Sequence, residues 1–295
     1  MEFAGSLLSE IISTHVKQSS KETTRPNYLP DKDEVTNIIK LLRRLLFPGY
    51  FDEGGTSDID MRCALSGLVM EVESKLQRQI CRALNLEPRK NRDCTDMFDK
   101  AGDICRKFLK KIPNIIEVLL SDVQATYDGD PAARSKHEII FAYPGIFAIS
   151  VFRLAHELHM LSVPLLPRMM TEYAHSRTGI DIHPGADIDH HFCIDHGTGV
   201  VIGETTKIGA FVKLYQGVTL GALSTRSGQN LRGKKRHPTL DDAVTVYSGA
   251  SILGGDTVVG KGSVIGGNVF ITQSIPPNTR VYLKNHELDY DAAGI

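Results

Sequence analysis

The sequence predicts an α+β multidomain protein, in which an N-terminal α-helical domain is followed by a left-handed parallel β-helix built from hexapeptide repeats. Two observations support this fold class. Up to about residue 178, glycine is sparse and apolar residues recur at helical spacing. Beyond that point glycine is frequent, and an aliphatic residue returns every six positions, which is typical of a β-helix. The length of 295 residues is enough for about two domains.

The N-terminal half contains several segments with helical apolar periodicity. These segments are 33–47, 65–85, 98–112 and 145–161. The last is apolar on most of its surface, so we expect it to be a buried helix. The first 32 residues contain most of the polar stretch "KQSSKETTRPNYLPDKD" (17–33). We therefore predict a polar arm over 1–32 and an α-helical domain over 33–178.

The repeats of the C-terminal half decide which side chains face inward. Three hexapeptides form one triangular coil of about 18 residues, and the aliphatic residue of each contributes to a shared core. The beat shifts its phase once before Ile202. The expected inward positions are Ile182, Ile188, Ile194, Val200, Ile202, Ile208, Leu214, Leu220, Leu240, Val246, Ile252, Val258, Val264 and Phe270. We predict a β-helix over 179–277 and a tail over 278–295. A β-sandwich is the alternative, but its strands recur about every 8–12 residues.

One segment interrupts the hexapeptide beat. Residues 223–238, "LSTRSGQNLRGKKRHP", contain five basic residues, no acids and no aliphatic period. We expect this segment to leave the coil as a loop, and long loops inside compact domains are usually functional or disordered. A solvated charge run is the plainer interpretation.

Composition narrows the class of protein. The formal net charge is −1, which gives no reason to expect a nucleic acid or a membrane surface as partner. The N-terminus lacks the basic region of a secretory signal, so we expect a cytoplasmic protein. The five cysteines are odd in number and form no CxxC pair, which favours reduced thiols.

The stretch 179–205 concentrates titratable side chains on the repeat frame. It holds four histidines, five acidic residues and one cysteine. A catalytic base, a metal site and a plain structural repeat would each explain part of this pattern. Imidazole titrates near neutrality, which suits a general base. We expect His183, His190 and His191 to be solvated or hydrogen-bonded side chains without a catalytic role.

An ordered set of motifs resembles the serine O-acetyltransferase family. The motifs are "DPAA" (130–133), "YPGIFAISVFRLAH" (143–156), "DIHP" (181–184), "DHGTGVVIGET" (195–205), "VTLG" (218–221) and "RHP" (236–238). The resemblance covers about residues 129–275 and implies a left-handed β-helix enzyme. It implies transfer of the acetyl group of acetyl-CoA to the hydroxyl of L-serine, in cysteine biosynthesis, by direct attack. No permanently bound cofactor and no metal are expected.

The resemblance also assigns roles to individual residues. His196 takes the position of the catalytic base, and Asp181 that of the acid which orients it. Asp195 is expected to bind the amino group of serine. Arg236 and His237 take the positions used for the serine carboxylate and the transition state. The residues expected to contact acetyl-CoA are Gly221, Ala222, Ser248 and Gly249, with help from the basic loop 223–238 for the phosphates.

One position departs from the family pattern. A second acid that binds serine usually follows four residues after the aspartate of "DPA", but this sequence has Arg134 there. Asp130 or Glu138 could replace it. The amino-group pocket is therefore the least determined part of the predicted site.

Other functions would also fit parts of this pattern. Another hexapeptide O-acetyltransferase would share the frame. A zinc carbonic anhydrase of the same fold could use His191 and His196 as ligands, and a non-catalytic regulator would need none of these side chains. Cys193 could serve as an acetylated nucleophile, but we expect a small buried thiol. "HELH" (156–159) lacks the histidine spacing of a zinc protease.

The resemblance further predicts partners. The family forms trimers with sites between neighbouring subunits, often paired into hexamers through the helical domain. In some members a tail ending in Gly-Ile inserts into O-acetylserine sulfhydrylase (cysteine synthase). This chain ends in Gly294 and Ile295, so we expect such a complex, in which the C-terminal carboxylate is captured.

Overall fold

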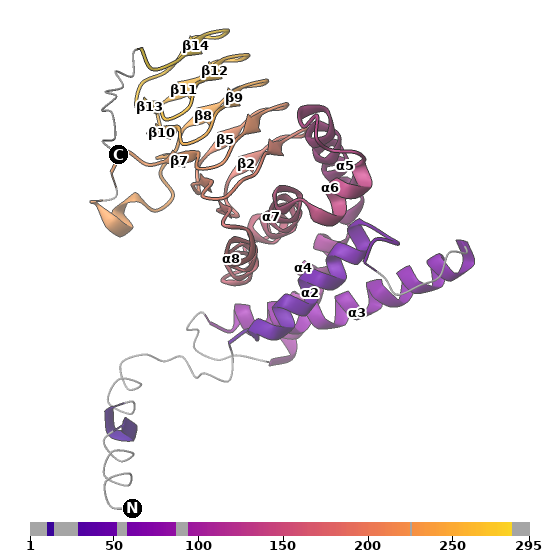
Figure 1. The fold of residues 1–295 in the computed structure, drawn as a ribbon. Coiled ribbons are helices and arrows are strands. Elements are labelled where there is room, and N and C mark those ends of the chain that lie inside the picture. The colour runs from indigo at the N-terminus through magenta and orange to yellow at the C-terminus, as the bar shows by residue number, and fades with distance from the viewer. Residues whose placement is uncertain (1–10, 15–28, 52–57, 87–93, 225, 285–295) are drawn as a thin grey trace, which may run out of the picture.

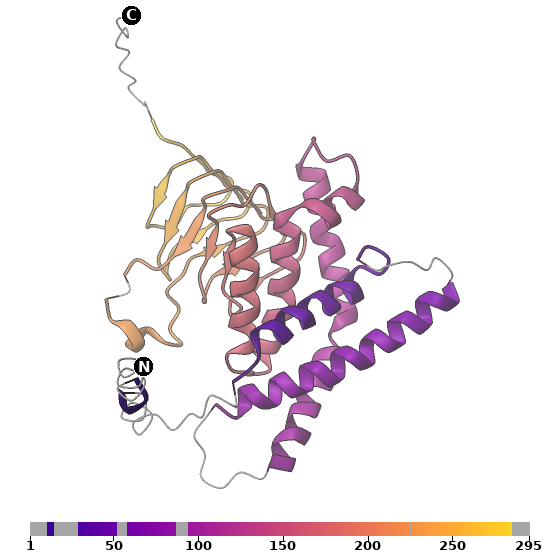
Figure 2. The ribbon, with the colours of Figure 1, turned by 60° about the horizontal axis from the view of Figure 1, so that its bottom comes forward.

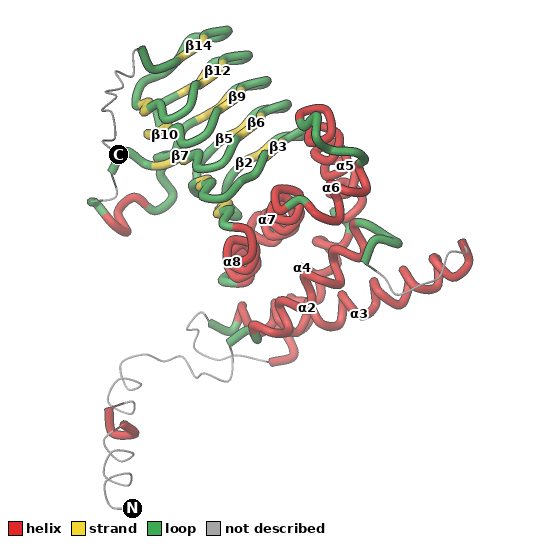
Figure 3. Tube along the Cα trace, in the orientation of Figure 1, coloured by secondary structure: helices red, strands yellow, loops and turns green. Residues whose placement is uncertain are grey.

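The computed structural model describes residues 11–14, 29–51, 58–86, 94–224 and 226–284. The predictions for most of the N-terminal arm and for the end of the tail, Ile295 included, lie outside these residues. Within them, the fold class is the predicted one. Helices make up the N-terminal part, and short parallel strands form a left-handed β-helix beyond it (Figure 1, Figure 3).

Several helices begin where the sequence supplies a cap or a proline. Their bounds are α2 (Lys32–Leu46), α3 (Asp58–Leu84), α4 (Cys94–Leu109), α5 (Ile112–Gly129), α6 (Lys136–Ala142), α7 (Pro144–Met160) and α8 (Leu166–Thr178). Asp31 caps α2, because its carboxylate accepts hydrogen bonds from the amides of Asp33 and Glu34 at 2.9 Å. Proline lies in the first turn of α5, α7 and α8, where its missing N–H needs no partner.

The predicted helical segments correspond to α2, α3, α4 and α7. The segment 98–112 was expected as one helix, but α4 ends at Leu109 and α5 begins at Ile112. Pro113 explains the break, because proline is tolerated in a first turn but not in a helix interior. As expected, α7 is almost entirely buried.

Three helices connect the helical part to the β-helix. In Figure 1, α5, α7 and α8 lie at the end of the stack of coils, and α2, α3 and α4 lie beyond them. Contacts of α5 and α7 with strand β3 (Cys193–Ile194), and of α8 with β1 (Asp181–Ile182), agree with this arrangement. Figure 2 shows that α3 extends past the other helices at one end. The chain passes from α8 into the first coil of the β-helix between Thr178 and Asp181.

The β-helix has three faces, each a parallel sheet. Face 1 contains β1, β4 (Val201–Ile202), β7 (Thr219–Gly221), β10 (Ser251–Leu253) and β13 (Phe270–Ile271). Face 2 contains β2 (Asp187–Ile188), β5 (Lys207–Ile208), β8 (Thr239–Leu240) and β11 (Val258–Val259). Face 3 contains β3, β6 (Lys213–Leu214), β9 (Thr245–Val246), β12 (Val264–Ile265) and β14 (Arg280–Val281).

The inward ladder of aliphatic residues is confirmed up to Ile252, and then differs by one position. Val258 and Phe270 are 37% and 68% exposed, whereas Val259, Ile265 and Ile271 are buried. The step from Ile252 to Val259 is seven residues instead of six. One extra residue, accommodated near Gly254, therefore shifts the phase of the last coils. The predicted inward positions Val258, Val264 and Phe270 were wrong for this reason.

A buried ion pair joins the helical part to the first coil. Arg153 of α7 contacts the Asp122 carboxylate of α5 at 2.5 and 2.8 Å, and both side chains are almost fully buried. Burial raises the pKa of Asp122, while Arg153 opposes that rise. Arg153 also donates to the carbonyls of Ile188 and Asp189, and Asp122 accepts from the Phe192 amide. The pair therefore holds the turn that leads into β3.

Among the described helices, no single one is long and apolar enough to span a membrane. Only α6 and α7 taken together meet that criterion, as a pair bent by 72°.

We predict that breaking the buried pair destabilises the fold strongly. Arg153→Met should lower the free energy of unfolding by about 3–5 kcal/mol, because it leaves the Asp122 carboxylate buried without its partner. The double variant Asp122→Leu/Arg153→Met should lose less than the sum of the two single changes. Urea unfolding followed by circular dichroism measures both. Arg106→Met, which breaks an exposed pair with Asp103, should cost under about 1 kcal/mol. A loss under about 1 kcal/mol for Arg153→Met would contradict the stabilising role of the Asp122–Arg153 pair.

Candidate active site

The predicted site residues lie on two different edges of the triangular β-helix. We call the turns between face 3 and face 1 edge 3–1, and the turns between face 1 and face 2 edge 1–2. Asp195 and His196 follow β3 and therefore lie on edge 3–1. Arg236 and His237 precede β8 and lie on edge 1–2. One chain thus divides the predicted catalytic set into two groups.

The turn that carries His196 is longer than the repeat allows. The inward strand residues step from Ile194 in β3 to Ile202 in β4, which is eight residues instead of six, although Val200 between them is also buried. The turn therefore holds two extra residues. His196 has a φ of +57°, which non-glycine residues seldom adopt. Its side chain is 72% exposed, and its Nε2 atom lies 3.8 Å from Asp195 Oδ1. The imidazole is therefore open to solvent and to a substrate.

Asp195 is linked to the helical part through Lys213. The Nζ atom of Lys213 lies 2.9 Å from Asp195 Oδ2 and donates to the carbonyl of Gly129 at 2.6 Å. It also stands 4.5 Å from the centre of the Tyr215 ring. Burial disfavours the charged form of Lys213, but Tyr215 and Asp195 outweigh it and raise the pKa. The side chain is accordingly an ammonium at neutral pH.

Of the two candidate replacements for the missing acid, Asp130 lies at this edge. Its carboxylate accepts from the Tyr143 hydroxyl at 2.7 Å and from the Ala132 amide at 2.8 Å. The Tyr143 hydrogen bond is the main cause of the lowered pKa of Asp130, to which Lys213 and His196 also contribute. The same hydrogen bond raises the pKa of Tyr143 to about 12. Asp130 is therefore ionised and near His196.

Glu138 instead serves the first turn of α6. Its carboxylate accepts from the Arg134 amide at 2.9 Å, while the Ser135 hydroxyl accepts from the Glu138 amide at 3.2 Å. This reciprocal arrangement resembles a capping box, which satisfies free amides at a helix start. We therefore favour Asp130 over Glu138 as the second acid.

Asp181 contacts Arg168 rather than His196. Arg168 Nη1 lies 3.3 Å from Asp181 Oδ1, and Arg168 Nη2 lies 2.5 Å from Glu172 Oε1. Among the hydrogen bonds and ion pairs of the described residues, none joins Asp181 to His196. Glu172, His175 and Asp181 could together offer ligand atoms to a cation, but the Arg168 guanidinium already pairs with two of them. The orienting role of Asp181 stays a prediction.

His237 is held as a neutral imidazole on edge 1–2. Its Nδ1 atom accepts from the Thr205 amide at 3.0 Å, so the ring proton must be on Nε2. Burial, with help from Arg236, lowers the pKa of His237 to about 4. The ring packs on Gly203, where an added Cβ would approach it to 2.1 Å. His237 is therefore a hydrogen-bond donor at neutral pH.

Arg236 is oriented by Glu204, which the sequence analysis did not assign. The two side chains form an ion pair, and both are about three-quarters buried. The Thr205 hydroxyl accepts from the amides of Arg236 and His237 at 2.9 and 3.1 Å. The motif "DHGTGVVIGET" contains Glu204 and Thr205, so these polar residues could have been recognised as candidates. Their contacts with Arg236 and His237 are visible only in the structure.

The residues expected to contact acetyl-CoA are also divided. Gly221 ends β7 and Ala222 follows it at edge 1–2, whereas Ser248 and Gly249 lie in the turn between β9 and β10 at edge 3–1. The basic loop leaves the coil between β7 and β8 and carries a short 3-10 helix, η2 (Gly228–Leu231). Its side chains at Arg226, Arg232 and Lys234 are exposed. They can therefore reach an anion.

The structure also weighs the alternatives. Cys193 is 3% exposed, and burial raises the pKa of its thiol to about 11, so a thiolate nucleophile is disfavoured. Neither His191 nor His196 belongs to a group of three potential metal ligands within the described part of the chain. The buried thiol of Cys193 argues against an acetyl-cysteine intermediate.

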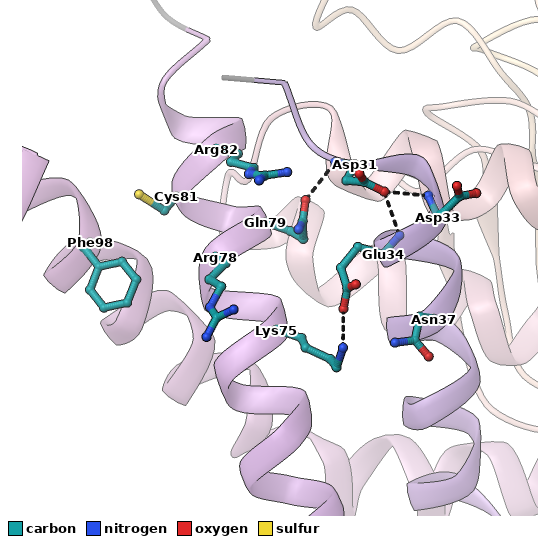
Figure 4. Close-up of a pocket in the computed structure, with 10 residues that line it drawn as sticks. All are labelled: Asp31, Asp33, Glu34, Asn37, Lys75, Arg78, Gln79, Cys81, Arg82 and Phe98. Atoms are coloured by element: carbon teal, nitrogen blue, oxygen red, sulfur yellow. Dashed lines mark hydrogen bonds and ion pairs between the residues drawn. The ribbon is translucent and has the colours of Figure 1, made fainter. Parts of the chain in front are cut away.

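A groove elsewhere in the molecule does not contain these residues. It lies between α2 and α3, has a volume of about 820 Å³, and is lined by acids of α2 and basic residues of α3 (Figure 4). Lys75 pairs with Glu34 at 2.7 Å, and Gln79 accepts from the Asp31 amide at 2.9 Å. These contacts hold two helices together.

Known proteins resemble the chain over most of its length. The "Serine acetyltransferase, plasmid" of Synechococcus elongatus is 45% identical over 255 residues, which cover 84% of this chain and 80% of that protein. The serine acetyltransferase of Bacillus subtilis is 44% identical over 159 residues, covering 54% and 70%. No protein-family model matches the chain.

Solved structures agree. Serine acetyltransferase 1 of Entamoeba histolytica, in complex with L-cysteine, superposes with a TM-score of 0.70 at 37% identity, covering 83% of this chain and 86% of that one. The serine acetyltransferase of Neisseria gonorrhoeae, in complex with serine, gives 0.56 at 25% identity, covering 84% and 95%.

We predict a pH dependence of stability that originates at His183. Burial lowers the pKa of His183 to about 4, and its Nδ1 accepts from the Gly185 amide at 3.0 Å. In the unfolded chain the pKa is about 6.5. Between pH 6.5 and 4 the unfolded state therefore binds a proton that the folded state does not, and stability falls as pH falls.

His183→Asn keeps an acceptor for Gly185 but cannot titrate. The loss of unfolding free energy between pH 7 and pH 5, measured with urea, should be smaller in this variant than in the wild type. The exposed His175→Asn serves as the control and should keep the wild-type dependence. An unchanged loss in His183→Asn would show that other groups cause the acid sensitivity.

Proposed function

The chain belongs to the serine acetyltransferase family, and from this premise we propose that it transfers the acetyl group of acetyl-CoA to the hydroxyl of L-serine by direct attack. The products are O-acetyl-L-serine and CoA, and the reaction serves cysteine biosynthesis. The observation that carries the proposal is the group on edge 3–1. There an open imidazole stands beside two carboxylates, on an enzyme frame shared with relatives of this activity.

The chemistry follows from this geometry. His196 takes the proton of the serine hydroxyl while the oxygen attacks the thioester carbonyl carbon. The carbon–sulfur bond then breaks, and the imidazolium returns the proton to the leaving CoA thiolate. The carboxylates of Asp130 and Asp195 attract the serine ammonium and so bring the hydroxyl to the base. They also stabilise the positive imidazolium.

The residues on edge 1–2 can supply a donor for the developing oxyanion and a partner for the serine carboxylate. The Nε2–H of neutral His237 can donate to the negative oxygen that develops on the attacked carbonyl. Arg236, held by Glu204, presents N–H groups suited to the serine carboxylate. With a folded-state pKa of about 4, His237 should not compete with His196 for the proton.

Because the two groups lie on different edges, a complete site requires a second copy of the chain. Edge 3–1 of one subunit facing edge 1–2 of its neighbour would join the base to the donors and the two sets of acetyl-CoA contacts. Three subunits arranged around a threefold axis would form this edge-to-edge contact three times. We therefore propose a homotrimer, which could pair into a hexamer.

The family supplies further expectations for this chain. Acetyl-CoA as co-substrate, without a permanently bound cofactor, follows from the family. The same holds for a cytoplasmic location. Docking of O-acetylserine sulfhydrylase on Ile295 stays a prediction, because that residue lies outside the described part of the chain.

We expect His196→Ala to lower kcat by about 10²–10⁴-fold, the contribution typical of a positioned general base. Cys193→Ala should keep most activity, and Asp181→Asn should lose less than His196→Ala. Release of free CoA, followed with a thiol reagent, should depend on L-serine. Release without serine, or only with an amino sugar, would overturn the substrate. A Cys193→Ala enzyme as inactive as His196→Ala would indicate an acetyl-cysteine intermediate.

A complementation experiment tests the shared site. His196→Ala and His237→Ala are each expected to be nearly inactive as pure proteins. In a mixed trimer, some interfaces combine two wild-type edges, so co-refolding or co-expression of the variants should restore part of the activity. No recovery in verified mixed oligomers would indicate that each chain carries a site by itself.

A further inference from the structure

Lys213 takes no part in the proposed proton transfer, yet its ammonium connects Asp195 to the end of α5 and to Tyr215. It begins β6, directly above Cys193 in the register of face 3. Outward side chains at this level lie under the C-terminal end of α5, which packs on β3. Its ammonium contacts the Gly129 carbonyl, the Asp195 carboxylate and the Tyr215 ring, as described above. An ammonium has three donors, and here it has two oxygen acceptors and an aromatic ring beside it.

The surroundings of Lys213 are shaped to hold it. A Cβ added at Gly129 would lie 3.3 Å from the ammonium and 3.6 Å from the side-chain stem. The chain has glycine at the last position of α5, so the lysine can pass close to the backbone. Its side chain is only 16% exposed, which limits the alternatives for the ammonium.

We propose that Lys213 is a positioning residue for the serine amino group. It acts by fixing the Asp195 carboxylate and by tying it to the end of α5. This role rests on the proposed function. One oxygen of Asp195 is held by Lys213, so the other is left toward His196 and the substrate. Gly129 is adjacent to Asp130, so the same ammonium fixes the separation of the two carboxylates.

The charges explain why a cation is needed at this place. Two carboxylates and one ammonium leave the pocket with a single negative charge, which matches one substrate ammonium. Without Lys213, two partly buried carboxylates would repel each other, and Asp195 would be free to turn away from the pocket. The family acid replaced by Arg134 makes this arrangement of Asp130 and Asp195 more important in this chain.

The test compares Michaelis constants. Lys213→Met should raise the KM for L-serine about tenfold, the effect of losing roughly one charge-assisted hydrogen bond. The KM for acetyl-CoA should change less than about twofold, since the contacts of Lys213 hold the proposed serine site and not the acetyl-CoA site. Lys261→Met, which breaks an exposed lysine–aspartate pair with Asp242, is the matched control and should leave both constants unchanged. An unchanged or lower KM for serine in Lys213→Met would overturn the proposal.

A second variant covers the case in which Lys213→Met does not fold. Gly129→Val keeps every charge but occupies the space of the ammonium, and should also raise the KM for serine selectively. Thermal unfolding of each variant shows which of them to interpret. If neither folded variant affects serine more than acetyl-CoA, the positioning role is wrong.

A double-mutant cycle separates positioning from a general structural effect. In an Asp195→Asn background, Lys213→Met should no longer change kcat/KM for serine by more than about twofold, because there is no carboxylate charge left to hold. An equal effect in both backgrounds would overturn the proposal. A wild-type enzyme that releases CoA without serine would instead refute the proposed function, whereas a serine-dependent wild type with unselective variants refutes only the role of Lys213.

Discussion

The inward ladder of aliphatic side chains is the constraint on which the rest of this structure depends. Each coil must place one such residue inside on every face, or the stack loses its continuous core. Residues beyond the hexapeptide therefore have to leave outward at an edge. The chain does this at the turn of His196, at the loop 223–238 and, by one residue, near Gly254. The first two places carry residues of the proposed chemistry, so core packing limits where reactive side chains can be displayed.

The helical part adds what the β-helix cannot provide alone. Apolar packing is not directional, so a helix resting on a flat face could rotate or slide. The buried Asp122–Arg153 pair removes that freedom, because it binds the carbonyls of Ile188 and Asp189 and the amide of Phe192. The end of α5 is then fixed above β6, where it meets Lys213. The position of Asp130 beside His196 is a consequence of this attachment.

The two edges differ in their electrostatics in a way that suits acyl transfer. Edge 3–1 combines acids with a solvated imidazole, whereas edge 1–2 keeps His237 neutral by burial and proximity to Arg236. A transfer of this kind needs a proton acceptor for the attacking hydroxyl and a donor for the developing oxyanion. Placing them on different edges separates two environments that would disturb each other. In the proposed trimer, this separation would also make assembly a condition for activity.

The sequence by itself determined the fold class, the helices with strong periodicity and the identity of His196, Asp195, Arg236 and His237 as candidates. Those features are local: a period of six, a helical repeat or an ordered motif can be read from neighbouring residues. Only the tertiary structure decided that Asp130 lies near His196 while Glu138 caps a helix, that Arg168 contacts Asp181, and that Glu204 pairs with Arg236. It also corrected the inward phase after Ile252. The contact between Gly129 and Lys213 joins residues 84 positions apart. Such contacts depend on how a helix docks on a coil, and no local pattern encodes that geometry.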